Sequence, residues 1–357
     1  MQSEQSALPA EAISGPRRRL SRMAQILGLL ALCGIGAELL SAYSDSTGNP
    51  GAIAFALVFF AALYGAPALL ARDLARRLGW GWPSLLAMCA ALGVVQACLI
   101  DQSLFSADYG GYAGWKESRE PTLIAALGIS GDNAYSFLVG HMIFSFAAPV
   151  ALAEAWAPAR VRTPWLGRLG TILAGLAYLA AAALIAGDPE SRSGSMPQLL
   201  GATGVVLALL LLAVVTGRYR AQVRADDAAG RTAPPIVAVI AAGLVAGLIP
   251  DFMPPTWPGV VGAATVTSVL GIAMLLASRR WTWTPRHAAA VGLGLLLERG
   301  LLAFTYYPLL GEVGAGAKYA HNAVMLLAVL LAGGLALVPR DRRASRPGAG
   351  GESVSAA

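Results

Sequence analysis

The sequence predicts an all-α integral membrane protein, a polytopic bundle of about ten transmembrane helices. Three observations predict this class. Hydrophobic residues make up 56% of the 357 residues and charged residues 13%, whereas soluble domains carry about 45–50% and about 25%. Ten apolar segments are long enough for a helix to cross the hydrocarbon core of a membrane. Arginines also collect in alternate connections, as the positive-inside rule requires.

The composition excludes a soluble enzyme, a nucleic-acid-binding domain, a disordered chain and a disulfide-stapled secreted module. The mean hydropathy of +0.61 leaves too much apolar surface for a soluble interior. The expected partner is therefore the lipid bilayer, with no nucleic acid. The three cysteines lie in apolar runs without CxxC or Cys/His spacing, so the sequence predicts no disulfide, metal site or cofactor.

Each predicted span is an apolar run of about 20 residues, and none shows the strict alternation of a membrane β-barrel. The ten spans cover residues 24–43, 51–71, 83–103, 134–157, 169–187, 198–216, 235–253, 260–278, 287–308 and 319–338.

The charge distribution predicts the orientation. If the N-terminus is cytoplasmic, 21 of the 26 cations fall in cytoplasmic segments and four in outer segments, with Arg299 inside a span. This asymmetry predicts that both ends are cytoplasmic. The strong preference for arginine over lysine suits a high-GC bacterial genome. We therefore expect a multi-pass protein of the bacterial plasma membrane.

The remaining segments are two tails and one long connection. Residues 1–22 and 340–357 are predicted to be disordered basic cytoplasmic tails that flank a transmembrane domain over 23–339. The outer connection 104–133 carries a short apolar stretch, acids and Gly110-Gly111. Loops of this length are often functional, and a structural cap is the alternative.

Polar side chains inside the spans are the candidate functional residues, because an ionisable group at the centre of a membrane helix costs about 2.5–3.5 kcal/mol. Most fall between the midplane and the outer face, which predicts a polar cavity open to the outside. Glu154 is the exception, near the cytoplasmic end, where we expect it to reach water. The candidates for a substrate or ion pathway are Glu38, Gln96, Asp101, His141, Glu298, Arg299, His321 and Asn322.

Arg299 is the candidate that most needs a polar partner inside its span, because a guanidinium keeps its charge at any ordinary pH. Glu298 precedes it directly, but neighbours on a helix point about 100° apart, which makes Glu298 a poor direct partner. Asp101 and Glu38 are better candidates from other helices. Arg299 is either half of a structural ion pair or a clamp for an anionic substrate.

The two histidines of the spans leave three roles open. His141 lies four residues before Ser145 on one helix face, and His321 precedes Asn322. Either histidine is a proton relay, a metal ligand or an interhelical hydrogen-bonding group. Gln96 and Asp101 are five residues apart, so an α-helix would point them about 140° apart.

Three stretches resemble a group of uncharacterised bacterial polytopic membrane proteins: YGAPALLARDLARRLGWGWPSLL (64–86), DQSLF (101–105) and GHMIFSFAAPVALAEAW (140–156). The resemblance covers roughly residues 30–160. It implies a multi-pass helical membrane protein and supplies no catalytic residues, because the group has no settled activity.

The sequence fits a secondary transporter or permease best. Its features are ten helices with both ends inside, Pro67 and Pro149 within spans, and buried charges toward the outer face. One alternative is a membrane enzyme acting on a lipid-linked or envelope substrate, with His141 or His321 as general base. Another is a noncatalytic sensor or complex subunit. Nothing in the sequence specifies catalytic residues.

Overall fold

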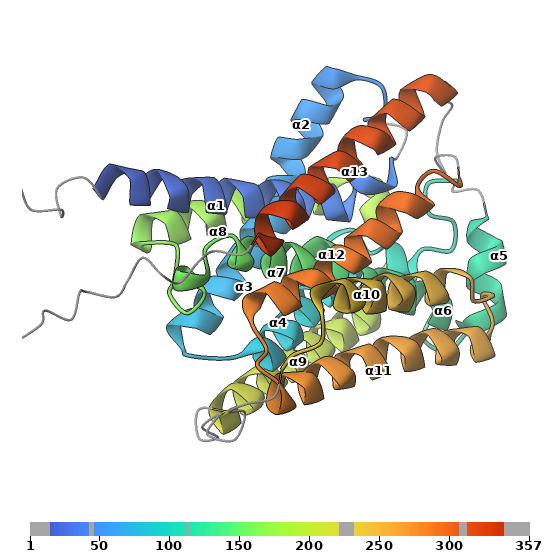
Figure 1. The fold of residues 1–357 in the computed structure, drawn as a ribbon. Helices are drawn as coiled ribbons and strands as arrows, with labels where there is room; N and C mark the ends of the chain where they lie inside the picture. The colour runs from blue at the N-terminus through green and yellow to red at the C-terminus, as the bar shows by residue number, and fades with distance from the viewer. Residues whose placement is uncertain (1–14, 43–45, 112–113, 221–231, 307–312, 339–357) are drawn as a thin grey trace, which may run out of the picture.

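A computed structural model describes a helical protein (Figure 1). The described residues are 15–42, 46–111, 114–220, 232–306 and 313–338. The predicted tails lie outside them apart from residues 15–22, and these begin the first helix instead of forming a disordered tail.

Long helical segments occur at all ten predicted positions. Seven of them, among the described residues, are long and apolar enough to cross a membrane: Pro50–Arg77, Trp82–Ile100, Gly131–Ala155, Arg168–Gly187 (α8), Met196–Arg218 within α9, Trp257–Arg280 (α11) and Ala315–Leu337 (α13). Two apolar segments are shorter, Arg22–Ala37 within α1 (Gly15–Ala37) and Ile236–Asp251 (α10). The helix Pro285–Leu302 (α12) carries Arg286, Glu298 and Arg299. The class of helical membrane bundle is therefore supported, while the count of ten spans and their orientation stay predictions.

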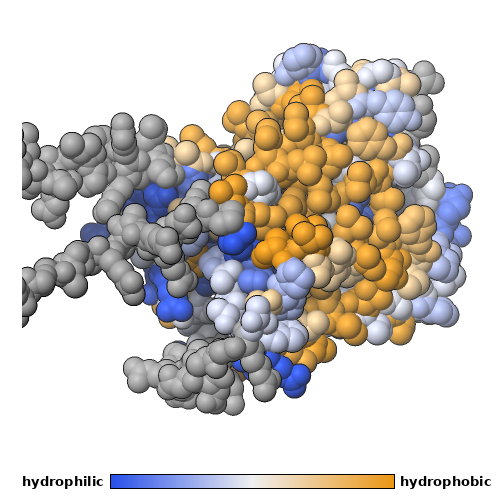
Figure 2. All heavy atoms as spheres, viewed as in Figure 1, coloured by the Kyte–Doolittle hydropathy of each residue, from blue (hydrophilic) through white to orange (hydrophobic). Residues whose placement is uncertain are grey.

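The surface divides into an apolar middle and polar ends (Figure 2). The outer helices α8, α9 (Met196–Arg220) and α11 bury little of their apolar length within the molecule. Such an exposed apolar band is expected of a surface that faces lipid, because soluble proteins rarely leave large apolar patches in water. The start of α1 lies at the opposite end of the molecule from α5 (Trp115–Arg119), which belongs to the predicted outer loop (Figure 1).

Glycines set the closest helix contact in the interior, between α10 and α12. A Cβ on Gly243 would lie 2.6 Å from the carbonyl oxygen of Val291, and one on Gly294 would lie 2.2 Å from that of Ile240. Both distances are too short for any side chain. The two backbones therefore touch directly, as small residues allow in membrane helices. This contact fixes the position of α12, which carries Glu298 and Arg299.

Three of the long helices widen into π-helical turns, an arrangement that the sequence did not predict. Ala61–Gly65 (η2) joins α2 (Pro50–Phe60) to α3 (Ala66–Arg77), and Val95–Ile100 (η3) continues α4 (Trp82–Val94). Tyr135–Val139 (η6) and His141–Ala147 (η7) connect α6 (Gly131–Ala134) to α7 (Ala148–Ala155). Two of these turns directly precede Pro67 and Pro149, whose rings would clash with a regular preceding turn.

The π-helical turn η3 corrects the expectation for Gln96 and Asp101. The backbone N–H of Asp101 donates to the carbonyl of Gln96 at 3.0 Å, an i to i+5 bond. The wider turn brings the two side chains together, and the Gln96 amide donates to the Asp101 carboxylate at 3.4 Å. The prediction that they point apart assumed α-helical geometry and is wrong.

The predicted outer loop is folded in the part that the structure describes. Short 3₁₀ turns, η4 (Ser103–Phe105) and η5 (Glu120–Thr122), flank α5. An antiparallel pair, β1 (Leu123–Ile124) and β2 (Ile129–Ser130), leads into α6. Within the loop, Trp115 is buried and its indole donates to the carbonyl of Ser106. The loop also rests on α9, because the Gln198 amide donates to the carbonyl of Leu127 at 2.7 Å.

Candidate functional site

A polar cluster lies where the π-helical turns η2 and η7 meet the end of α1. The Tyr64 hydroxyl donates to the Glu38 carboxylate at 2.6 Å. The Tyr64 ring stacks on His141 with centroids 5.5 Å apart, and Nδ1 of His141 lies 3.0 Å from the Ser145 hydroxyl. Three spans thus contribute one connected chain of polar groups. π-Helical turns are often found at functional sites.

Asp101 extends this cluster from η3. Its carboxylate accepts from both the backbone N–H of Ser103 at 2.9 Å and the Ser103 hydroxyl at 2.8 Å. The negative charge of Asp101 also acts on Glu38 and Tyr64. The hydrogen bonds from Gln96 and Ser103 therefore fix the position of the Asp101 carboxylate in this region.

Arg299 supplies positive charge to the same region. Its guanidinium lies over the Phe144 ring of η7, 4.8 Å from the ring centroid. Its charge acts on Glu38, His141 and Glu298. Glu38, Tyr64, Asp101, His141 and Arg299 form what we call the polar cluster.

Glu298 points away from the polar cluster, toward α10. Its side chain is buried and packs against Gly247, where an added Cβ would lie 2.9 Å from its Oε2. The Asp251 carboxyl at the end of α10 lies close enough for its negative charge to act on Glu298. No hydrogen-bond donor among the described residues reaches either oxygen of Glu298. We call Glu298 and Asp251 the carboxyl pair.

Tyr135 of η6 completes the surroundings of the carboxyl pair. Its hydroxyl lies 2.6 Å from that of Thr267 on α11, and the charges of Asp251 and Glu298 both act on it. Asp251 is exposed, whereas Glu298 is buried. The pair therefore links the protein interior to its surface.

His321 and Asn322 bond to backbone groups at helix ends. Nε2 of His321 lies 2.7 Å from the carbonyl of Leu39, in the 3₁₀ turn η1 (Leu39–Ser41), and the Asn322 amide donates to the carbonyl of Ala303 at 2.8 Å. The Ala303 carbonyl follows the last turn of α12, where carbonyls lack partners within the helix, so Asn322 satisfies it. The Leu39 carbonyl accepts from Ala42 of its own turn as well as lying against His321. The contacts favour the interhelical hydrogen-bonding role for both residues.

Lys318 is one of the four cations that the charge pattern predicts in outer segments, yet it is buried in the first turn of α13. Its ammonium also donates to the carbonyl of Ala303 and lies 5.2 Å from the centroid of the Tyr319 ring. Ala303 directly follows α12, and a cation there is favoured by the negative end of the helix dipole.

The sequence predicted that Glu154 reaches water, but its side chain is buried in an ion-pair network. Its carboxylate accepts from Arg72 at 3.0 Å and from Arg76 at 2.8 Å. The Arg72 guanidinium also stacks on Trp165 at 3.8 Å, and Asp73 accepts from the backbone N–H of that residue. We call these five residues the arginine lock, because they fasten α3, α7 and the following connection together.

The predicted pathway residues therefore separate into groups. Glu38, Asp101, His141 and Arg299 share the polar cluster, with Gln96 behind Asp101. Glu298 belongs to the carboxyl pair, and His321 and Asn322 contact backbone carbonyls of neighbouring segments. Across the ranges that the structure describes, no group of three or more His, Cys, Asp or Glu residues is placed to hold a metal ion.

The comparisons with known proteins add no identification. No protein-family model, curated protein or solved structure matches the chain. The resemblance to uncharacterised bacterial membrane proteins therefore stays a prediction, and function must be argued from the site.

Proposed function

We propose that the chain is a secondary transporter of the plasma membrane that couples the movement of a small organic anion to protons at the carboxyl pair. The observation that carries this proposal is the buried Glu298 carboxyl, which faces Asp251 and has no hydrogen-bond donor among the described residues. A buried carboxyl near a second acid is a suitable place for a proton to bind and leave, because burial and like charge both disfavour its ionised form.

The order of residues on α12 supports coupling. Glu298 faces α10 and the surface-exposed Asp251, while Arg299 faces η7 and the polar cluster. Adjacent residues of one helix thus belong to two sites. Loss of the proton from Glu298 would place a negative charge beside Arg299 and weaken its attraction for an anion. Protonation would reverse this effect.

The test uses the full chain in liposomes with an imposed pH gradient and a mixture of small organic anions outside. Mass spectrometry of the liposome contents identifies any accumulated solute. We expect Glu298→Gln to abolish accumulation but to retain exchange of that solute without a gradient, because a neutral amide mimics the protonated state. Glu117→Gln, an exposed acid in the outer loop, is the matched control.

Absence of any solute above the level in empty liposomes would contradict transport of this class. Accumulation that survives Glu298→Gln would instead place the coupling elsewhere.

The enzyme alternative rests on His141 and its contact with Ser145. Replacement of both His141 and His321 by Gln distinguishes the two functions. A transporter coupled at the carboxyl pair should keep measurable accumulation, whereas a histidine-based catalyst would lose its activity, typically by about 10²-fold or more. Complete loss of accumulation in a correctly folded double variant would instead place a histidine in the transport pathway, beside the carboxyl pair.

A further inference from the structure

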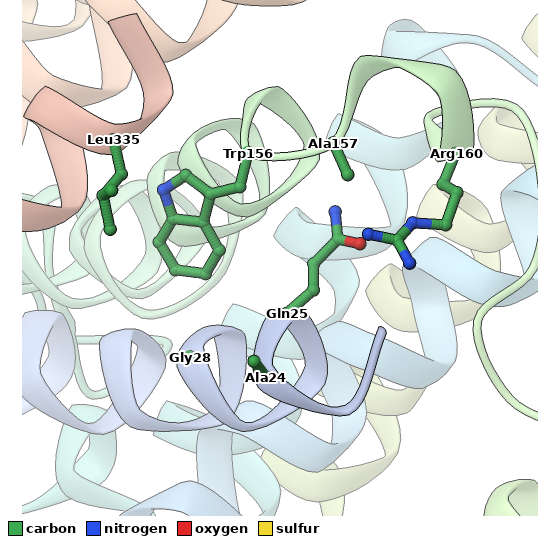
Figure 3. Close-up of a pocket in the computed structure, with 7 residues that line it drawn as sticks. All are labelled: Ala24, Gln25, Gly28, Trp156, Ala157, Arg160 and Leu335. Atoms are coloured by element: carbon green, nitrogen blue, oxygen red, sulfur yellow. The ribbon is translucent and has the colours of Figure 1, made fainter. Parts of the chain in front are cut away.

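A pocket lies far from the carboxyl pair, between α1, the end of α7 and the end of α13 (Figure 3). It encloses about 300 Å³, which is at the lower end of the range for small-molecule sites. Its lining residues are Ala24, Gln25, Gly28, Trp156, Ala157, Arg160 and Leu335. None of them belongs to the polar cluster, the carboxyl pair or the arginine lock.

The walls of the pocket are built by specific packing. The Trp156 indole donates to the carbonyl of Ala332 on α13 at 2.8 Å. On its other side it fills the space over Gly28, where an added Cβ would lie 2.5 Å from the ring. The indole is therefore held between two helices and forms a rigid apolar wall.

The polar end of the pocket is formed by Gln25 and Arg160. Figure 3 shows the Gln25 amide and the Arg160 guanidinium facing one another there. Gln25 is only 3% exposed, and its Nε2 donates to the carbonyl of Ala153 at 2.7 Å. Its Oε1 has no hydrogen-bond donor among the described residues. Buried acceptors in proteins are nearly always satisfied, so this oxygen is a place for a donor from a ligand or a water.

An exposed apolar surface of α13 lies beside the polar end of the pocket. Leu335 lines it and is 58% exposed, and Leu331 lies one turn earlier on α13 with 61% of its surface exposed. The predicted cytoplasmic boundary of the membrane crosses this region, because Arg22 and Arg162 are both exposed nearby in the chain. Basic pockets between membrane helices on that side bind phospholipid headgroups.

We propose that this pocket binds the headgroup of an anionic phospholipid, phosphatidylglycerol. Arg160 donates to the phosphate, a headgroup hydroxyl donates to Oε1 of Gln25, and the acyl chains lie along the exposed leucines of α13. The pairing is consistent with the donors and acceptors available, since guanidinium and phosphate form charge-assisted hydrogen bonds.

The test is native mass spectrometry of the full chain in detergent with added phosphatidylglycerol. Phosphatidylethanolamine, phosphatidylcholine and soluble glycerol phosphate are added in parallel. We expect preferential retention of phosphatidylglycerol, and a reduction of at least about fivefold in Arg160→Gln, since one cation near an anionic headgroup contributes about 1 kcal/mol. Arg162→Gln is the matched control, because Arg162 is exposed on the same connection but does not line the pocket.

A second variant, Ala24→Phe, fills the pocket from an exposed position and leaves Arg160 intact. It should also lose the lipid while keeping the thermal stability of the wild type. Equal retention of phosphatidylcholine or phosphatidylethanolamine, or binding of glycerol phosphate alone, would overturn the proposal. Equal loss in Arg160→Gln and Arg162→Gln would also overturn it, since it would show only general surface charge.

Discussion

Glu154 shows how much a single buried acid can stabilise. Its carboxylate accepts from two guanidiniums, and neither Arg72 nor Arg76 is accessible enough for water to replace it. We expect Glu154→Gln to lower the free energy of unfolding by about 3–5 kcal/mol, because buried Arg76 then loses its paired carboxylate and buried Arg72 loses one of its two, keeping Asp73. The change is measured as the thermal unfolding temperature in detergent.

An exposed acid provides the comparison for Glu154. Glu117→Gln removes one negative charge from the surface loop and should leave the unfolding temperature within about one degree, since exposed charges contribute little. If both variants unfold at the same temperature, the arginine lock does not stabilise the fold as we describe.

The sequence identified those candidate residues whose polar or charged side chains cost free energy inside an apolar span. Glu298 and Arg299 were recognisable because charges are rare in membrane helices. Tyr64 was missed, because a tyrosine in a span looks like any other aromatic residue. Lys318 and Glu154 lie near span ends, where water is the default partner. Only tertiary contacts reveal that both are buried.

The close contact between α10 and α12 depends on glycines. Their spacing in the sequence indicates that another helix approaches closely, but it does not say which helix. Gly294→Ala would place a methyl group 2.2 Å from the carbonyl of Ile240. We expect α10 and α12 to separate, with a loss of about 1–3 kcal/mol from overpacking. Because α12 carries Glu298, the same variant should also reduce transport, which tests the structural link between packing and site.

Gly201→Ala is the control for Gly294→Ala, since a Cβ on this residue of α9 would meet nothing within 4 Å. It should be neutral or should stabilise by up to about 1 kcal/mol, because alanine favours a helix over glycine. Unfolding temperatures are compared for the two variants. Equal destabilisation by both would contradict the role of direct backbone contact.

Hydropathy predicted where the helices lie in the sequence, but it did not predict the π-helical turns within them. The ten apolar runs coincide with ten helical segments, because hydrocarbon demands internally bonded backbone. The π-helical turns depend on Pro67, Pro149 and the packing of polar side chains across spans. A periodicity of 3.6 residues gives no sign of them, and the wrong expectation for Gln96 and Asp101 follows directly.

At the scale of the whole molecule, the orientation of the chain is the prediction on which the direction of transport depends. The charge pattern places the connection that holds Arg162 in the cytoplasm and the connection that holds Ser193 outside. Both residues are exposed. The native Cys33, Cys89 and Cys98 are buried, so their reaction with a polar reagent should be slow. A cysteine introduced at either exposed position should therefore react selectively.

In intact cells, a membrane-impermeant maleimide should label Ser193→Cys directly and Arg162→Cys only after permeabilisation. The reverse result would invert the chain and place the carboxyl pair on the cytoplasmic side. Labelling of both from the same side would exclude an odd number of crossings between the two positions and end the model of ten spans.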